Sequence, residues 1–160
     1  MKPVIALENI RSAYNVWNII RTADWLWFDV VLLWYSPSPF ENEKVLKTSL
    51  WAEKNVNLKQ FYNVKKWIDY LKSNYKTLIW AEITPNAIPL DRLSEKIDNN
   101  FCIIVWNEVD WISIETLEQL DIVSFIPMKG IKKSLNVCEA ASIFMRELRI
   151  RRDIRRLSRR

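Results

Sequence analysis

The chain has 160 residues, of which 49% are hydrophobic and 27% are charged, a balance typical of one globular domain and not of a disordered chain. It contains no histidine and two cysteines, which excludes a Ser-His-Asp triad and a histidine-bound metal and makes a zinc site unexpected. We therefore expect no metal as a partner. No apolar run approaches the roughly 20 residues that span a bilayer, so we expect no membrane as a partner either.

Strand-like and helical patterns alternate along the chain. In chain order, we predict a strand at 3–8, a helix at 15–25, a strand at 29–34, a polar loop at 35–42 with a short helix behind it, a strand at 55–60, a helix at 63–74, a strand at 76–83, a loop at 84–100, a strand at 101–106, a helix at 114–120, a strand at 121–127 and a helix at 136–157. This alternation predicts one α/β domain over residues 1–160, with a mostly parallel sheet and helices on both of its faces.

The end of the first predicted helix is unusual. We expect Asn15 to be its N-cap, and the helical pattern stops after Asp24, directly before the apolar strand. A helix that turns straight into a strand usually ends on a residue with positive φ, most often glycine. The sequence has Trp25 near that point, and a bulky residue with positive φ is an outlier.

Three polar segments follow predicted strands, at 81–86, 106–113 and 126–136. In parallel α/β sheets the ligand lies outside the carboxyl ends of the strands, so these segments are the candidate site. The side chains of Glu108 and Ser134 suit hydrogen bonding to a ligand. Asn136 suits it too, but Asn136 could equally be only the N-cap of the last helix.

At these segments the sequence resembles the SpoU/TrmH family of SPOUT-class RNA methyltransferases. The family's first motif, Asn-x-Gly followed by an arginine, corresponds to residues 15–21, and its second, a Gly-Asn-Glu-x-x-Gly loop, corresponds to residues 106–111. The third motif stands intact in residues 126–137, from Ile-Pro-Met through Ser-Leu-Asn-Val. Order and spacing agree over about residues 3–150.

The chain departs from the family at its glycines, because it has one glycine and nine tryptophans. Only Trp67 has the surroundings of a core aromatic; Trp17, Trp106 and Trp111 stand at family glycine positions, and Trp25, Trp27, Trp34, Trp51 and Trp80 stand near turns or element ends, where glycine is also expected. Our hypothesis is that UGA codons read as glycine in the source organism have been translated as tryptophan. The alternative is a genuine tryptophan-rich protein whose rings stack on RNA bases and which binds RNA without catalysis.

The resemblance implies an α/β fold with a deep trefoil knot near the C-terminus, a homodimer, and S-adenosyl-L-methionine as cofactor. The implied reaction methylates a ribose 2′-hydroxyl of RNA, with tRNA favoured over rRNA. Arg21 would bind the neighbouring phosphate and stabilise the developing alkoxide; the alternative for Arg21 is a solvated pair with Asp24. The implied catalytic residues are Arg21, Asn15, Glu108, Ser134 and Asn136, and the implied cofactor-binding residues are Ala81, Trp106, Ile126, Met128, Ser134 and Leu135.

The C-terminal segment 146–160 is rich in arginine, and the net charge of the chain is +5. We expect this basic helix and tail to bind RNA phosphates, or otherwise to be a solvated helix end or a surface for anionic membranes. An apolar stripe of Ile150, Ile154 and Leu157 is expected to pack while the arginine face stays in water. The expected RNA-binding residues are Arg21, Arg149, Arg151, Arg152, Arg155 and Arg156.

Two further expectations concern assembly and location. The helix at 136–157 is apolar around much of its circumference, so one sheet face cannot cover it and a second copy of the chain is expected on its other side. Cys102 and Cys138 stand in apolar surroundings without a C-x-x-C spacing, which favours buried free thiols and a cytoplasmic location.

Overall fold

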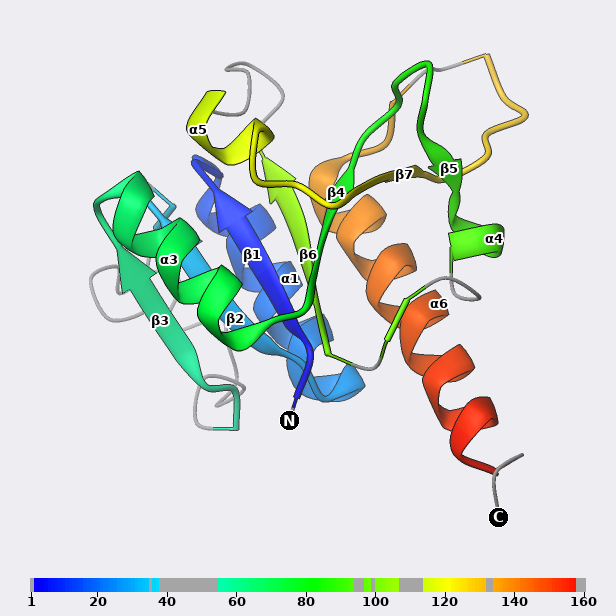
Figure 1. Cartoon of the computed structure of the whole chain (residues 1–160), viewed down its shortest axis with the longest axis horizontal. Coiled ribbons are helices and arrows are strands. Elements are labelled where there is room, and N and C mark those ends of the chain that lie inside the picture. The colour runs from blue at the N-terminus through cyan, green and yellow to red at the C-terminus, as the bar shows by residue number, and fades with distance from the viewer. Residues whose placement is uncertain are drawn as a thin grey trace.

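The computed structural model of the chain describes residues 2–34, 36–37, 55–93, 97–98, 100–106, 114–131 and 134–157, without the side chains of residues 152 and 154–156 (Figure 1). The short helix expected behind the loop at 35–42, and nearly all of that loop, lie outside these residues. Within the described ranges no helix is both long enough and apolar enough to cross a membrane.

One seven-stranded sheet forms the centre of the molecule, in the order β3-β2-β1-β6-β4-β7-β5. All of its strand pairs are parallel, which confirms the predicted sheet type. The strands are β1 (Val4–Glu8), β2 (Asp29–Leu33), β3 (Leu58–Phe61), β4 (Thr77–Ala81), β5 (Ile88–Pro89), β6 (Phe101–Trp106) and β7 (Ile122–Phe125). The strand predicted at 55–60 begins later, at Leu58.

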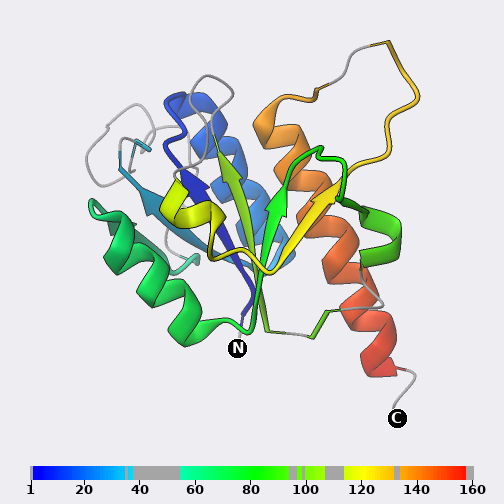
Figure 2. The same cartoon turned by 45° about the horizontal axis from the view of Figure 1, so that its top comes forward.

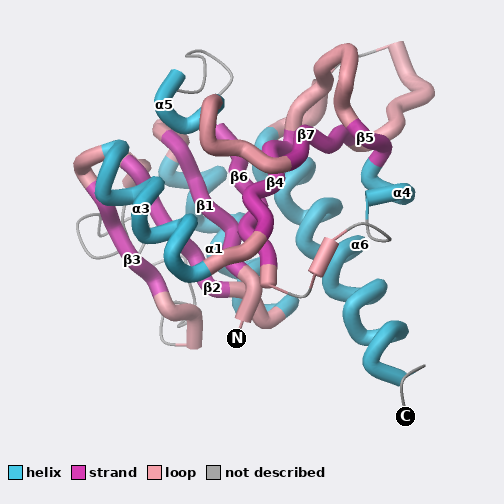
Figure 3. Tube along the Cα trace, in the orientation of Figure 1, coloured by secondary structure: helices cyan, strands magenta, loops and turns pink. Residues whose placement is uncertain are grey.

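Helices cover both faces of this sheet, as predicted (Figures 2 and 3). The helices are α1 (Ala13–Leu26), α3 (Val64–Asn74), α4 (Leu90–Leu93), α5 (Ile114–Leu117) and α6 (Val137–Leu157). Successive residues of a strand point to opposite faces, so Ile103 of β6 packs in the core under α1 and α6, whereas Ile104 packs under α3. Trp67 lies fully buried in the α3 core, which confirms it as a core aromatic.

The segment at 84–100, predicted to be a loop, contains β5 and α4. The hydroxyl of Ser124 in β7 donates a hydrogen bond to the carbonyl of Ile88 at 2.8 Å, and Leu90 and Leu93 are buried in the core beside α6. A two-residue strand and a one-turn helix carry too little periodicity to be recognised, and these contacts with distant residues stabilise them.

The start of α1 also differs from the prediction. The helix begins at Ala13, and its N-cap is Ser12, whose Oγ accepts a hydrogen bond from the backbone N–H of Asn15 at 3.3 Å. Asn15 therefore lies inside the first turn, and its prediction as N-cap was wrong. Serine caps a helix as well as asparagine does, so the local preference does not distinguish the two positions.

α1 ends in a motif whose left-handed residue is usually glycine, and here that residue is a tryptophan. The N–H of Trp27 bonds to the carbonyl of Asp24 at 3.2 Å, and the N–H of Phe28 bonds to the carbonyl of Ala23 at 2.8 Å. These are the two hydrogen bonds of a Schellman motif. Its left-handed residue is Trp27, with φ 62° and ψ 47°, and not Trp25, which lies within the last turn. The strand can then begin at once because this motif reverses the chain within two residues.

Buried hydrogen bonds fix the loops that follow β1 and β2. The hydroxyl of Ser36 accepts from the N–H of Ile10 at 2.9 Å and lies 3.3 Å from the carbonyl of Leu7. The amide of Gln60 in β3 donates to the carbonyl of Trp34 at 2.9 Å. The carboxyl edge of the sheet is therefore rigidly connected from β1 to β3, and the candidate site lies along this edge.

Candidate active site

A cavity of about 800 Å³ opens at the carboxyl edge of the sheet, where β4, β6 and β7 end. This is the position at which parallel α/β sheets bind their ligands, and the volume suits a small-molecule cofactor. The segments after β4 and β7, the end of β6 and the start of α6 form its walls. The lining residues are Trp80, Ala81, Glu82, Ile83, Thr84, Pro85, Val105, Trp106, Phe125, Ile126, Met128, Ser134, Leu135, Val137, Ala140 and Phe144.

Every residue that we expected to bind a cofactor lies on this cavity. The six are Ala81, Trp106, Ile126, Met128, Ser134 and Leu135. The sequence did not single out residues 82–85, although it marked the segment 81–86 as one that follows a strand. It also missed Val137, Ala140 and Phe144, because their helical spacing reads as ordinary core packing of α6.

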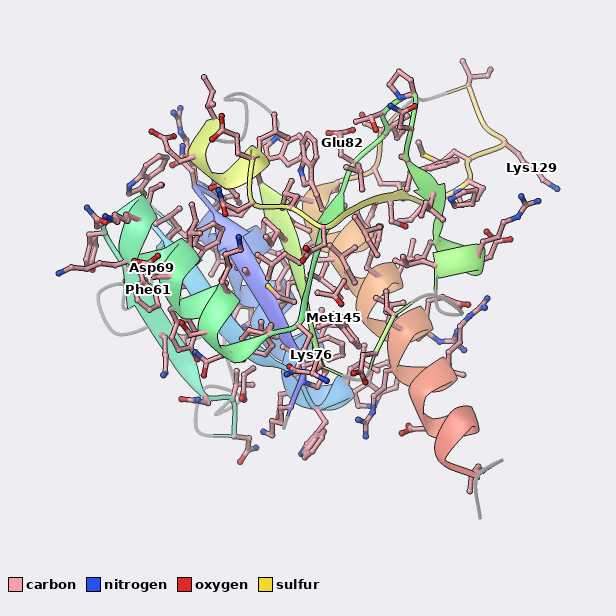
Figure 4. The ribbon with its side chains drawn as sticks, in the orientation of Figure 1. Phe61, Asp69, Lys76, Glu82, Lys129 and Met145 are labelled. Carbon is pink, nitrogen blue, oxygen red and sulfur yellow. The ribbon has the colours of Figure 1, made fainter. Side chains whose placement is uncertain are left out.

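Glu82 is the one ionisable side chain among these lining residues. It directly follows β4, and its position at the carboxyl edge is labelled in Figure 4. Its Oε1 accepts a hydrogen bond from the N–H of Ile83 at 2.5 Å. This local bond positions the carboxylate, so the described part of the cavity wall is mainly apolar with one negative charge.

Two indole rings stand against each other in the wall of the cavity. The ring centroids of Trp80 and Trp106 are 4.4 Å apart, with 39° between the planes. The Nε1 of Trp80 is buried and makes no hydrogen bond within the described part of the chain. Position 106 corresponds to a family glycine, and a glycine there would leave more of the cavity open to a ligand.

Arg21 lies on the exposed side of α1 and is not among the residues that line the cavity. Its guanidinium lies 4.9 Å from the ring centroid of Trp17, whose ring in turn lies 6.2 Å from that of Tyr14. Arg21 and Asp24, both described, form no ion pair with each other, so the pairing that was the alternative for Arg21 is absent. Asn15 also lies away from the cavity, and Glu108 lies outside the described residues.

Asn136 stabilises the start of α6. Its Oδ1 accepts from the N–H of Cys138 at 2.9 Å, and its carbonyl accepts from the N–H of Ala140 at 3.0 Å. It is therefore the N-cap of α6, which was one of the two roles expected for it. Ser134 differs, because its side chain is exposed and lines the cavity.

Two arginines of the basic end of α6 form ion pairs within the helix. Arg149 lies 3.4 Å from Asp153, and Arg151 lies 2.5 Å from Glu147. The expected packing of the apolar stripe was wrong for a single chain, because Ile150 and Leu157 are 37% and 70% exposed. This part of α6 extends beyond the sheet, and the described residues of the chain leave its apolar side chains exposed (Figure 1). The side chain of Ile154 lies outside the described residues.

The two cysteines are free, and neither is suited to nucleophilic chemistry. Burial raises the pKa of the Cys102 thiol well above its ordinary value, and burial together with the neighbouring Glu139 raises the pKa of the Cys138 thiol. Both thiols therefore stay protonated near neutral pH. Cys138 is only half-buried, contrary to expectation. Among the described residues there is no cluster of cysteine and acidic side chains that would hold a metal ion.

A sequence model of the SpoU rRNA methylase family matches residues 2–146. The chain belongs to the SpoU rRNA methylase family. This match spans α1 and the part of α6 up to residue 146, so the family assignment covers every residue that lines the cavity.

Named members of the family differ in their RNA. The chain is 32% identical over 147 residues to the tRNA (guanosine(18)-2′-O)-methyltransferase of Borreliella burgdorferi, covering 91% of this chain and 65% of that protein. It is 26% identical over 148 residues to the 23S rRNA (guanosine(2553)-2′-O)-methyltransferase RlmP of Bacillus subtilis, covering 92% and 58%. The chain thus spans about three fifths of the length of these relatives.

The fold agrees with solved structures of the family. The SpoU methyltransferase AviRb of Streptomyces viridochromogenes, solved in complex with the cofactor AdoMet, superposes with a TM-score of 0.81 at 17% identity. The match covers 94% of this chain and 60% of AviRb. At this level of identity the similarity establishes the shared α/β fold.

Proposed function

We propose that the chain is an S-adenosyl-L-methionine-dependent RNA methyltransferase that methylates a ribose 2′-hydroxyl. One observation carries the proposal: in a chain of this family, four residues of the third family motif line the cavity at the carboxyl edge, namely Ile126, Met128, Ser134 and Leu135. We favour tRNA over rRNA as the substrate, because the more similar of the two named relatives acts on tRNA.

The lining of the cavity fits the cofactor. Apolar walls suit an adenine ring, and the irregular backbone at Ile126, Met128 and Leu135 offers N–H and carbonyl groups that are not used in strands. Ser134 would add a hydroxyl, and Glu82 would attract the positive charges of the cofactor. When bound, the cofactor supplies an electrophilic methyl group on a sulfonium.

Arg21 would act on the RNA rather than on the cofactor. A guanidinium keeps its proton at any physiological pH, so it is a poor base but a good partner for a phosphate or a developing alkoxide. Stacking on Trp17 would hold the guanidinium in place. Asn15, Glu108, Ser134 and Asn136 would orient Arg21, the ribose and the loops, and the arginines of α6 would contact more distant phosphates.

We also propose that the active enzyme is a homodimer. Two observations support this: Arg21 lies outside the cavity of its own chain, and α6 exposes Ile143, Ile150 and Leu157 at a spacing of seven residues along one side. A second copy packed on this side would cover the stripe and could bring its Arg21 to the cavity. The deep trefoil knot of the C-terminal part is likewise a proposal, supported by the shared family fold.

A second function, RNA binding without catalysis, is favoured by the paired rings of Trp80 and Trp106 in the cavity wall. Recoded glycines would remove this obstacle. We propose recoding because backbone geometry supports it: of the three described non-glycine residues with positive φ, two are tryptophans, Trp27 and Trp34. Codons of the gene test this directly, since UGG at these positions would contradict it.

The function is tested with two proteins, the chain as it stands and a variant with glycine at positions 17, 106 and 111. Calorimetry measures the affinity for S-adenosyl-L-methionine, and mass mapping locates 2′-O-methylated nucleotides after incubation with bulk tRNA and rRNA. We expect the glycine variant to bind the cofactor and to methylate one nucleotide. RNA binding without cofactor binding in both proteins would instead support the non-catalytic function.

A further inference from the structure

A basic and aromatic surface lies at the β3 edge of the sheet, away from the cavity. Residues 55–76 contain five lysines and one aspartate: Lys59, Lys65, Lys66, Lys72 and Lys76 against Asp69. Lys72 donates a hydrogen bond to Gln119, and Lys76 forms an ion pair with Asp98 at 3.1 Å. The other three lysines are exposed, and none of them takes part in the ion pairs of the described residues.

Aromatic rings lie between these three lysines. The Nζ of Lys59 lies 4.3 Å from the ring centroid of Tyr70, which lies 5.2 Å from that of Phe61. Lys66 precedes Tyr70 by one helical turn on the same side of α3. Tyr62, between β3 and α3, is 63% exposed. We name Lys59, Tyr62, Lys65, Lys66 and Tyr70 the β3–α3 surface.

This surface shares an edge of the molecule with the candidate active site. Because the sheet is parallel, the carboxyl end of β3 lies on the same edge as the ends of β4 and β6. The order β3-β2-β1-β6 separates β3 from β6 by three strand spacings, or roughly 14 Å. Figure 4 shows Phe61 at the β3 edge and Lys76 at the far end of α3.

We infer that the β3–α3 surface binds an unpaired segment of the substrate RNA, on the same side of the molecule as the methylated nucleotide. The ammonium groups of these three lysines, which form no ion pair within the described residues, are complementary to a phosphate backbone, and the exposed ring of Tyr62 provides a face on which an unpaired base stacks. A protein partner would require more apolar area than the two tyrosines offer. The inference rests on the proposed function, since it assumes an RNA substrate.

The experiment compares Lys59→Gln/Lys65→Gln/Lys66→Gln with a control, Lys72→Gln/Lys76→Gln, which removes lysines of the same segment at the opposite end of α3. Binding of unfractionated tRNA and of a single-stranded RNA oligonucleotide is titrated over a range of salt concentrations. We expect the triple variant to lower the log–log salt slope by about 2, or roughly 0.7 for each lost contact to a single strand. The control should leave the slope nearly unchanged.

A second pair of variants tests stacking. Tyr62→Ala should weaken binding of the oligonucleotide by about fivefold to a hundredfold, whereas Tyr62→Phe keeps the ring and should bind normally. An unchanged slope in the triple variant, or equal slopes in the triple variant and the control, would overturn the inference. The inference would also be overturned if the triple variant lost binding to anionic phosphatidylserine vesicles but kept its RNA binding, because the surface would then be one that binds membranes.

These outcomes are separable from failure of the proposed function. The RNA titrations need no cofactor. With glycine at positions 17, 106 and 111, calorimetry with S-adenosyl-L-methionine should give the same affinity with and without the three lysine substitutions. RNA binding that depends on the β3–α3 surface without methyl transfer would support the inference and contradict the catalytic function. A parent chain that binds no RNA would overturn both.

Discussion

At the scale of single residues, the structure distinguishes a buried tryptophan, Trp67, from two tryptophans with positive φ, Trp27 and Trp34. Trp67 is fully buried on α3 among apolar side chains, whereas Trp27 and Trp34 have φ values of 62° and 55°. A side chain in the left-handed region costs about 1–2 kcal/mol because its Cβ crowds the backbone. Trp27 is therefore strained, although contacts of its ring with Lys2 and Arg149 offset part of this strain.

Comparing glycine with alanine at positions 27 and 25 isolates this backbone effect, since both substitutions remove the ring. At position 27 we expect Gly to be more stable than Ala by about 1 kcal/mol. At position 25, inside the helix, we expect Ala to be more stable than Gly by about 0.5–1 kcal/mol. Urea denaturation of the four variants measures both differences. If alanine were more stable than glycine at position 27 as well, position 27 would not need a glycine-type backbone.

Glu82 gives a second prediction at this scale. Glu82→Gln keeps the shape of the side chain and its bond to Ile83 but removes the negative charge from the cavity. We expect the affinity for S-adenosyl-L-methionine to fall about tenfold, since a hydrogen-bonded charge contributes roughly 1.5 kcal/mol or more. S-adenosylhomocysteine lacks the sulfonium charge and should lose less. Equal affinities of variant and parent for both ligands would exclude this role for Glu82.

At the scale of the elements, α6 has two different surfaces. Its inner side, with Ala141, Phe144 and Leu148, is buried against the sheet and α1. A hydrogen-bond contact of 3.3 Å between the hydroxyls of Thr22 and Ser142 connects α1 to α6. The outer side has Ile143, Ile150 and Leu157 in a row, and the described residues of the chain leave all three exposed. A row of exposed apolar side chains suits packing against another surface, as the proposed dimer would provide.

The α6 stripe predicts where a dimer would come apart. Ile150→Glu should convert a dimer at low micromolar concentration into monomers, because a carboxylate would be buried without a partner in the interface. Ile114→Glu is the matched control, since Ile114 on α5 is also exposed but faces a different side of the molecule. Sedimentation measures both variants. A parent chain that is already monomeric would contradict the proposed dimer.

At the scale of the whole molecule, the components of the candidate site are divided between two surfaces. Six residues of the family motifs line the cavity, whereas Arg21 and Asn15 lie on α1 outside it. Arg149 and Arg151 are held in ion pairs within α6, so RNA would have to compete with Glu147 and Asp153 for them. A site divided in this way can be completed by a second copy of the chain.

Mixing subunits tests this division. One subunit has Arg21→Ala, and the other has Ser134→Phe, which fills the cavity, with glycine at positions 17, 106 and 111 in both. Each variant alone should be inactive. A mixture should recover about a quarter to a half of the parent's methyl transfer, because one of the two sites in a mixed dimer then has both intact parts. No recovery after confirmed subunit exchange would mean that each chain contains its own complete site.

The sequence predicted the family, the parallel α/β sheet and six of the residues that line the cavity, because these depend on local patterns and on segments that each follow a strand. Tertiary structure alone decided that Trp27 and not Trp25 is the left-handed residue, since the entry of Phe28 into the core sets where α1 ends. It also decided that Arg21 lies apart from the cavity and that Ile150 is exposed. Those outcomes depend on how helices lie against the sheet, and contacts between residues far apart in the chain leave no periodic signal in the sequence.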